Sequence, residues 1–265
     1  GRRGLVDEVG ETGEQGRVHG LGDGLETRLG VTVVAEAERE SARIEDLDGE
    51  LALGLGDDGH AEPGLEAVTE PVDAALLARL ADLVDEATTA FEGYDYARCL
   101  ERTEAFFWDL TDNYLELVKN RAYGGSGEGP ARSARATLRT TLATVLRLFA
   151  PVLPFVTEEV WSWWREGSIH ATDWPTSREL RAAAGDVDPA VYTVASDVLG
   201  EIRKAKSEAK RPLRTEVTAA VVTDTAERLA ALDQVTGDVC DAGRVEDLTS
   251  STGSPFGVDV TLAEE

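Results

Sequence analysis

The chain has 265 residues and a formal net charge of −25, with 26 lysines and arginines against 51 aspartates and glutamates. So acidic a composition argues against a generally basic nucleic-acid binder, although a local cluster of cations could still contact phosphates. No apolar run is long enough to span a membrane, so we expect neither a membrane partner nor DNA binding.

Cysteine content indicates the compartment. Cys99 and Cys240 are far apart in the sequence, and neither belongs to a Cys-x-x-Cys pair. We expect reduced thiols, no metal site and a cytoplasmic protein. The chain begins with Gly1 and contains no methionine, so we also expect it to be a fragment of a longer product. Its strong acidity would suit a cytoplasm of high salt, where charges are screened.

Residues 1–66 differ in composition from the rest. They hold more than half of the glycines and contain no lysine and no aromatic residue; the first aromatic of the chain is Phe91. Only residues 31–44 could form a short strand or helix. A segment without bulky apolar groups cannot offset the entropy lost on ordering, so we expect this one to be largely disordered.

Apolar periodicity from Pro71 onward predicts a mainly α fold. Asp73 is the candidate cap of the first helix and Asp95 that of the second, while Pro212 ends the last long helix. Residues 124–130 are expected to form a flexible loop, and 168–177 a connector. The predicted helices span residues 73–92, 95–123, 131–149, 155–164 and 189–211.

After Pro212 the apolar period changes. Residues 217–223 and 257–262 alternate as strands do, and residues 225–232 read as a helix. The expected architecture is therefore a helical bundle over residues 67–185, followed by a long basic helix and a small C-terminal α/β appendage over residues 186–265.

The second helix contains the most informative stretch, Phe106-Phe-Trp-Asp-Leu-Thr-Asp-Asn-Tyr-Leu-Glu-Leu-Val-Lys-Asn-Arg-Ala-Tyr123. Phe107, Leu110, Tyr114 and Leu117 share one helix face, and a second apolar face lies beside it. A helix that is apolar on two sides is expected in the middle of a bundle.

This stretch resembles the anticodon-binding helical domain of valyl-tRNA synthetases. Three further segments match in the same order: Leu148-Phe-Ala-Pro-Val-Leu-Pro-Phe-Val-Thr-Glu-Glu-Val-Trp161, Gly167-Ser-Ile-His170 with Trp174-Pro175, and Ile202-Arg-Lys-Ala-Lys-Ser-Glu-Ala-Lys210. The Ala-Pro to Glu-Glu-x-Trp element is shared with isoleucyl and leucyl relatives. The ending Lys119-Asn-Arg121 and the segment from Lys204 to Lys210 favour the valyl branch. The resemblance covers roughly residues 67–265.

The resemblance implies a role in tRNA charging. Intact members of that family use ATP to attach valine to its tRNA. This chain shows no His-x-Gly-His motif, no Lys-Met-Ser-Lys-Ser loop and no editing insertion, so we expect no catalytic residues, no cofactor and no catalysis from it alone. We expect a monomer that holds the anticodon arm of valine tRNA. The alternative is a free-standing helical protein-interaction module that has lost tRNA binding.

Candidate tRNA-binding residues fall in three groups of cations. In the long helix, Arg203, Lys206 and Lys210 share one face, and Lys204 and Arg211 widen it; the other reading is a solvated helix flank. Arg132, Arg135 and Arg139 form a second stripe. Lys119 and Arg121 end the central stretch, where cations also favour the helix dipole.

Aromatic side chains are a further possibility. Trp161, Trp163, Trp164 and Trp174 could stack on anticodon bases, but bundle core is the commoner use of tryptophan. His170 has no ligand set or nucleophile at a suitable spacing and is interpreted as structural.

Overall fold

The computed structural model describes residues 64–263. The segment predicted to be disordered therefore lies outside the described residues, apart from its last three positions. Within the described range the protein is mainly helical, with one small sheet near the C-terminus, and this confirms the predicted fold class. None of the helices between residues 64 and 263 is long and apolar enough to cross a membrane.

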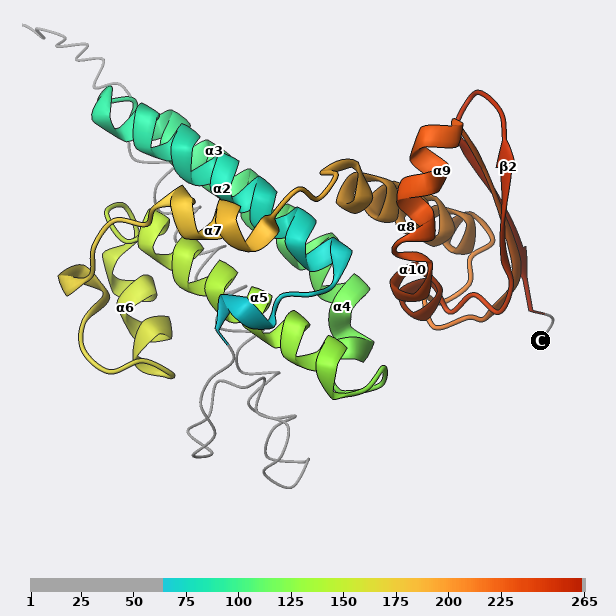
Figure 1. The fold of residues 1–265 in the computed structure, drawn as a ribbon, viewed down its shortest axis with the longest axis horizontal. Helices are drawn as coiled ribbons and strands as arrows, with labels where there is room; N and C mark the ends of the chain where they lie inside the picture. The colour runs from blue at the N-terminus through green and yellow to red at the C-terminus, as the bar shows by residue number, and fades with distance from the viewer. Residues whose placement is uncertain (1–63, 264–265) are drawn as a thin grey trace, which may run out of the picture.

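The first part of the described chain is a helical bundle (Figure 1). After a short 3-10 helix at Leu65–Ala67, its helices are α2 (Pro71–Glu92), α3 (Tyr96–Asp109), α4 (Leu115–Ala122), α5 (Glu128–Phe149), α6 (Pro154–Ser162) and α7 (Ser177–Ala184). Pro71 and Pro154 each occupy a first turn, where no backbone donor is needed. In Figure 1, α7 lies along α2, and α2 also packs against α5.

The predicted central helix is interrupted. A π-helical turn at Leu110–Tyr114 separates α3 from α4, and the N–H of Leu115 donates to the carbonyl of Leu110 five residues earlier. Asp95 caps α3 as predicted, because its carboxylate accepts from the N–H of Arg98. The prediction that Asp73 caps α2 is wrong: Asp73 lies inside the helix and is fully buried.

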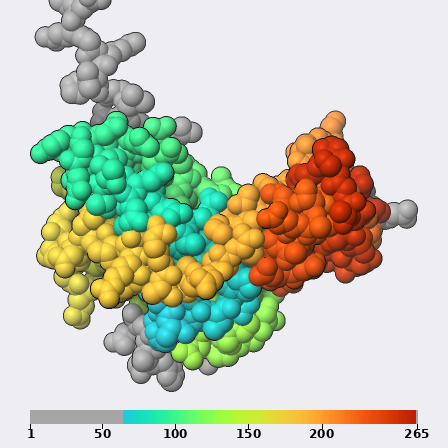
Figure 2. All heavy atoms as spheres, turned by 45° about the horizontal axis from the view of Figure 1, so that its top comes forward, coloured from blue at the N-terminus to red at the C-terminus, as the bar shows by residue number. Residues whose placement is uncertain are grey.

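α8 (Ala190–Glu208) connects the bundle to a small α/β unit, residues 209–263, which we call the C-terminal lobe. The lobe contains β1 (Val217–Asp224), α9 (Ala226–Asp233), α10 (Thr236–Gly243), β2 (Leu248–Thr252) and β3 (Gly257–Leu262). β1 is the middle strand, parallel to β2 and antiparallel to β3. β1, α9 and β3 were predicted; α7, α10 and β2 were not. Figure 2 shows the lobe projecting from one end of the bundle.

A single apolar core runs through both units. It includes Leu80 of α2, Leu117 of α4, Val198 of α8 and Val222 of β1. A smaller cluster around Trp161 lies between α5 and α6. Because α8 contributes to the core on the bundle side and on the lobe side, the two units are packed together and are not merely tethered.

Candidate nucleic-acid interface

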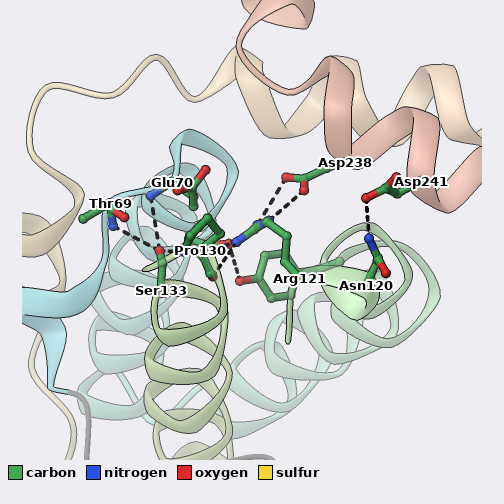
Figure 3. Close-up of polar contacts among 10 residues, drawn as sticks. Thr69, Glu70, Asn120, Arg121, Pro130, Ser133, Asp238 and Asp241 are labelled. Atoms are coloured by element: carbon green, nitrogen blue, oxygen red, sulfur yellow. Dashed lines mark hydrogen bonds and ion pairs between the residues drawn. The ribbon is translucent and has the colours of Figure 1, made fainter. Parts of the chain in front are cut away.

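Arg121 lies in a buried polar network where α4 meets α10 (Figure 3). Its guanidinium forms two hydrogen bonds with Asp73, from Nη1 at 3.0 Å and Nη2 at 2.8 Å. On its other edge, Nε and Nη2 donate to the carboxylate of Asp238 at 2.7 and 3.2 Å. Nη1 also donates to the carbonyl of Pro130 at 3.2 Å. Only 3% of Arg121 is exposed.

Asp73 accepts hydrogen bonds from two further side chains. The hydroxyl of Tyr114 donates to it at 2.8 Å, and the hydroxyl of Ser133 donates at 2.6 Å. Ser133 in turn accepts from the backbone N–H groups of Thr69 and Glu70 at the entrance to α2. The carboxylate therefore ties α2, the π-helical turn, α4 and α5 together, which explains why the tyrosine and the arginine of the central stretch are both buried.

The charges in this network shift one another. Burial acts to lower the pKa of Arg121, but the hydrogen bonds and charges of Asp73 and Asp238 outweigh it and leave the pKa above its ordinary value. Burial raises the pKa of Asp238, and Arg121 opposes this. Burial, followed by the charge of Asp73, raises the pKa of Tyr114. The shifts of Arg121 and Tyr114 favour a charged guanidinium and a neutral phenol, the forms that donate to the carboxylates here.

The placement of Arg121 corrects one expectation. The guanidinium is enclosed and all its donors are used within the protein, so it does not present a cation to an RNA phosphate. Its neighbour Lys119 is half-buried and approaches Glu116 at 3.5 Å.

The prediction that Lys206 belongs to an exposed basic face of α8 is also wrong. It is 1% exposed, and its Nζ donates to the carbonyl oxygens of Leu213 at 2.9 Å and Gly243 at 2.8 Å. Burial lowers its pKa, and the nearby guanidinium groups of Arg244 and Arg203 lower it further. The carbonyls of two chain turns therefore hold this ammonium in place, and it is not a surface contact.

The other cations at the end of α8 vary in exposure. Lys204 is exposed and pairs with Glu201 at 3.0 Å, and Lys210 is exposed just beyond the helix. Arg203 is half-buried and donates to the carbonyl of Asp112 at 2.6 Å. Arg211 is half-buried and donates to the carbonyl of Ala263 at 3.3 Å. Sequence reasoning missed Arg214 and Arg244, which are both exposed in the same region of the lobe.

The arginines of α5 do not form one surface stripe. Arg132 is exposed, whereas Arg135 is half-buried and its Nε donates to the carbonyl of Ala122 at 3.0 Å. Arg139 is buried, with its guanidinium carbon 5.8 Å from the ring centre of Trp164. Of these three arginines only Arg132, near the N-terminal end of α5, is exposed.

Three of the four tryptophans singled out from the sequence are at least partly enclosed. Trp161 is core, Trp164 packs beside it, and Trp174 donates to the hydroxyl of Thr88 at 2.8 Å. Trp163 is 44% exposed, and the neighbouring Phe155, which sequence reasoning missed, is 81% exposed. Two aromatic side chains, one in the first turn of α6 and one just after its end, are therefore exposed.

His170 forms a hydrogen bond between Nε2 and the carbonyl of Pro154 at 3.1 Å, which fits the structural role expected of it. Among residues 64–263 no group of His, Cys, Asp and Glu is arranged to hold a metal ion.

Comparison with known proteins gives two findings. The family model described as the anticodon-binding domain of tRNA ligase matches residues 73–222. The chain is also similar to proteins named valine–tRNA ligase: 47% identical to that of Salinispora tropica over 80% of this chain and 26% of the relative. For Thermobifida fusca the identity is 51% over 78% of this chain and 23% of the relative. For Cutibacterium acnes the identity is 39% over 94% of this chain and 28% of the relative. This alignment is longer than residues 67–265, so the similarity extends into the segment before residue 67. The chain thus spans about a quarter of the length of these curated relatives.

Proposed function

The chain belongs to the family that carries the anticodon-binding domain of tRNA ligases, and on that basis we propose that it binds the anticodon arm of a tRNA that accepts valine. The family match carries the proposal, because it extends from α2 into β1 and so includes the bundle, α8 and the first strand of the lobe. The valine specificity rests on the names of the similar proteins.

Exposed and half-buried cations offer phosphate contacts in two places. In the bundle, Lys119 and Arg132 lie near the junction of α4 and α5. At the end of α8 and in the lobe, Lys204, Lys210 and Arg244 are exposed. Because the rest of the chain is strongly acidic, phosphate contact is expected only where such cations gather.

The proposed role is positional. The bundle holds the anticodon arm at a fixed place, and charging with valine and ATP is chemistry that we do not expect this chain to perform alone. We propose that the chain performs this positional role in the cytoplasm. Incubating the purified chain with valine, ATP and valine tRNA should give no charged product.

Binding itself is tested by fluorescence anisotropy with valine tRNA and with an unrelated tRNA, at several salt concentrations. Two double variants remove the candidate phosphate-binding cations: Lys119→Ala with Arg132→Ala, and Lys204→Ala with Lys210→Ala. A matched control, Arg98→Ala with Arg178→Ala, removes two exposed charges from α3 and α7. Each lost phosphate contact should flatten the log–log salt dependence by roughly 0.7–0.9 units. If both test variants keep the slope of the control, the cations named here are solvated flanks.

A protein-interaction module is the second candidate function. It is favoured by the exposed aromatic side chains of Phe155 in α6 and Trp163 just after it, together with the net charge of −25. If the chain binds neither tRNA at low salt, this alternative is favoured, because phosphate contacts are strongest at low salt.

A further inference from the structure

Arg121 uses every hydrogen that it can donate. A guanidinium has five N–H groups in a planar fork, and five hydrogen bonds to Asp73, Asp238 and the carbonyl of Pro130 account for all of them. Each carboxylate receives two bonds from one edge of the fork, the geometry of the strongest arginine pairs.

The partners of this one side chain belong to different units. Asp73 is in α2 and Pro130 in α5, both in the bundle, whereas Asp238 is in α10 of the lobe. A second bond runs beside it, because Asn120 Nδ2 donates to Asp241 Oδ2 at 2.7 Å (Figure 3). Two adjacent residues of α4 therefore form hydrogen bonds with two residues of α10 that are one turn apart.

The two sides of the joint differ in how firmly they are held. Asp73 has no exposed surface and is braced by Tyr114 and Ser133. The side chain of Asp238 is 11% exposed and accepts two hydrogen bonds from Arg121. The bundle side of Arg121 is thus part of a rigid core, and the lobe side is the part that a single substitution can release.

The lobe keeps independent support when that side is released. Lys206 of α8 holds the last turn of α10 through the carbonyl of Gly243, and Val239 of α10 is part of the shared core. A change at Asp238 is therefore expected to alter the orientation of the lobe and to leave it folded.

We propose that Arg121 is a positioning residue that sets the orientation of the C-terminal lobe on the bundle, so that cations of both units meet one tRNA. Only the statement that the cations meet one tRNA rests on the proposed function; the orientation of the lobe does not. Arg121 touches no RNA; it acts through Asp238. Contacts from two rigidly joined units bind more tightly than the same contacts joined by a mobile hinge, because the second contact then costs less entropy.

The orientation is tested without RNA. Spin labels are attached at Glu116→Cys on α4 and Glu227→Cys on α9, both exposed, in a chain that also carries Cys240→Ser. The distance distribution from double electron–electron resonance should be narrow in this parent and broad with Asp238→Asn. Asp238→Glu, which restores a carboxylate, should narrow it again. Asp233→Asn, an exposed substitution on α9 with the same charge change, is the matched control and should leave it narrow.

The affinity for tRNA is then measured with the same substitutions in the unlabelled chain. Asp238→Asn should weaken binding of valine tRNA on the order of tenfold, although it removes a negative charge that would otherwise repel RNA. Asp233→Asn should weaken nothing. A broad distribution with a folded lobe and weaker binding is the expected result.

Other outcomes decide against parts of the proposal. A narrow distance distribution in Asp238→Asn overturns the positioning role. A broad distribution with unchanged affinity overturns the link between orientation and tRNA. If the unsubstituted chain binds no tRNA at all, the proposed function fails, while the spin-label distances still decide whether Arg121 orients the lobe.

Discussion

The ammonium nitrogen of Lys206 lies 2.8 Å from the carbonyl oxygen of Gly243, so a cation of α8 holds the last turn of α10. Cations near the end of a helix also interact favourably with its dipole. The chain thus uses one of its few lysines to fasten the lobe to α8.

Lys206→Met should therefore destabilise the protein. It keeps an apolar stem of similar length and leaves two carbonyl acceptors, the buried one of Gly243 and the partly buried one of Leu213, without this donor, which costs about 1–3 kcal/mol. Because burial lowers the pKa of Lys206, part of this loss is offset by relief of its desolvation, and the lower half of the range is expected. Urea unfolding measures the change, and amide exchange should speed up in α10. Lys204→Met is the control; equal destabilisation by both would show that the carbonyl contacts contribute little.

Tyr114→Phe should cost about 1.5–3 kcal/mol, the range for a hydrogen bond to a charged group. The substitution removes only the hydroxyl that donates to Asp73. Tyr96→Phe, at an exposed position, should change the free energy of unfolding by less than about 0.5 kcal/mol. A similar melting temperature for Tyr114→Phe and the unsubstituted chain would mean that Asp73 is satisfied without the tyrosine.

Phe107→Ala tests the packing of the central stretch. Phe107 is buried, and its ring centre lies 6.1 Å from that of Phe149 on α5. Truncating a core aromatic residue costs about 3–5 kcal/mol, a large share of the stability of a typical domain. The variant should unfold at much lower urea concentrations; a variant that melts normally but fails to bind tRNA would make Phe107 a contact residue.

Stability should fall at alkaline pH. Burial raises the pKa of Tyr114 well above 10.0 and also raises that of Tyr192. Both phenols stay protonated in the folded chain and ionise near pH 10 once it unfolds, so their contribution is complete below about pH 10 and is lost as the pH rises toward the folded values. Two such groups give a slope of up to about 2.7 kcal/mol per pH unit. The two thiols, whose pKa burial raises, add to the slope above pH 9.0.

This slope is measured from urea unfolding between pH 8 and pH 11, with phenolate absorbance recorded in parallel. Tyr192→Phe should remove about half of the tyrosine contribution. Ionisation of all tyrosines while the circular dichroism remains native would contradict the expected shifts.

Local patterns predicted the elements whose burial is regular. α2, α5, α8, β1 and β3 each repeat apolar residues at the period of their own structure, so one sequence suffices to find them. α7 and β2 offer little such signal: in α7 only Leu180 and Ala184 are buried, and β2 is exposed except at Leu248. Their places depend on contacts with distant parts of the chain.

The placement of the cations could be predicted only in part. Spacing shows which residues share a face of one helix, but not which other element covers that face. Arg121 nevertheless continues the buried face of Tyr114 and Leu117, and Lys206 follows Ile202 by four residues. Those relations indicate burial, and they were the available signal that both cations are structural. The carboxylates that pair with Arg121 lie 48 and 117 residues away, beyond any local pattern.

The π-helical turn at Leu110–Tyr114 contains one residue more than an α-helix would place between its hydrogen-bonded ends. Each residue of a helix advances the next side chain by about 100° around the axis. The extra residue therefore rotates the side chains of α4 around the helix axis relative to those of α3. Deleting a single residue of the turn would restore the α-helical phase and rotate Arg121 away from both of its carboxylates. The alignment of two units thus depends on one inserted residue, so changes of length in this stretch should be tolerated far less well than changes of side chain.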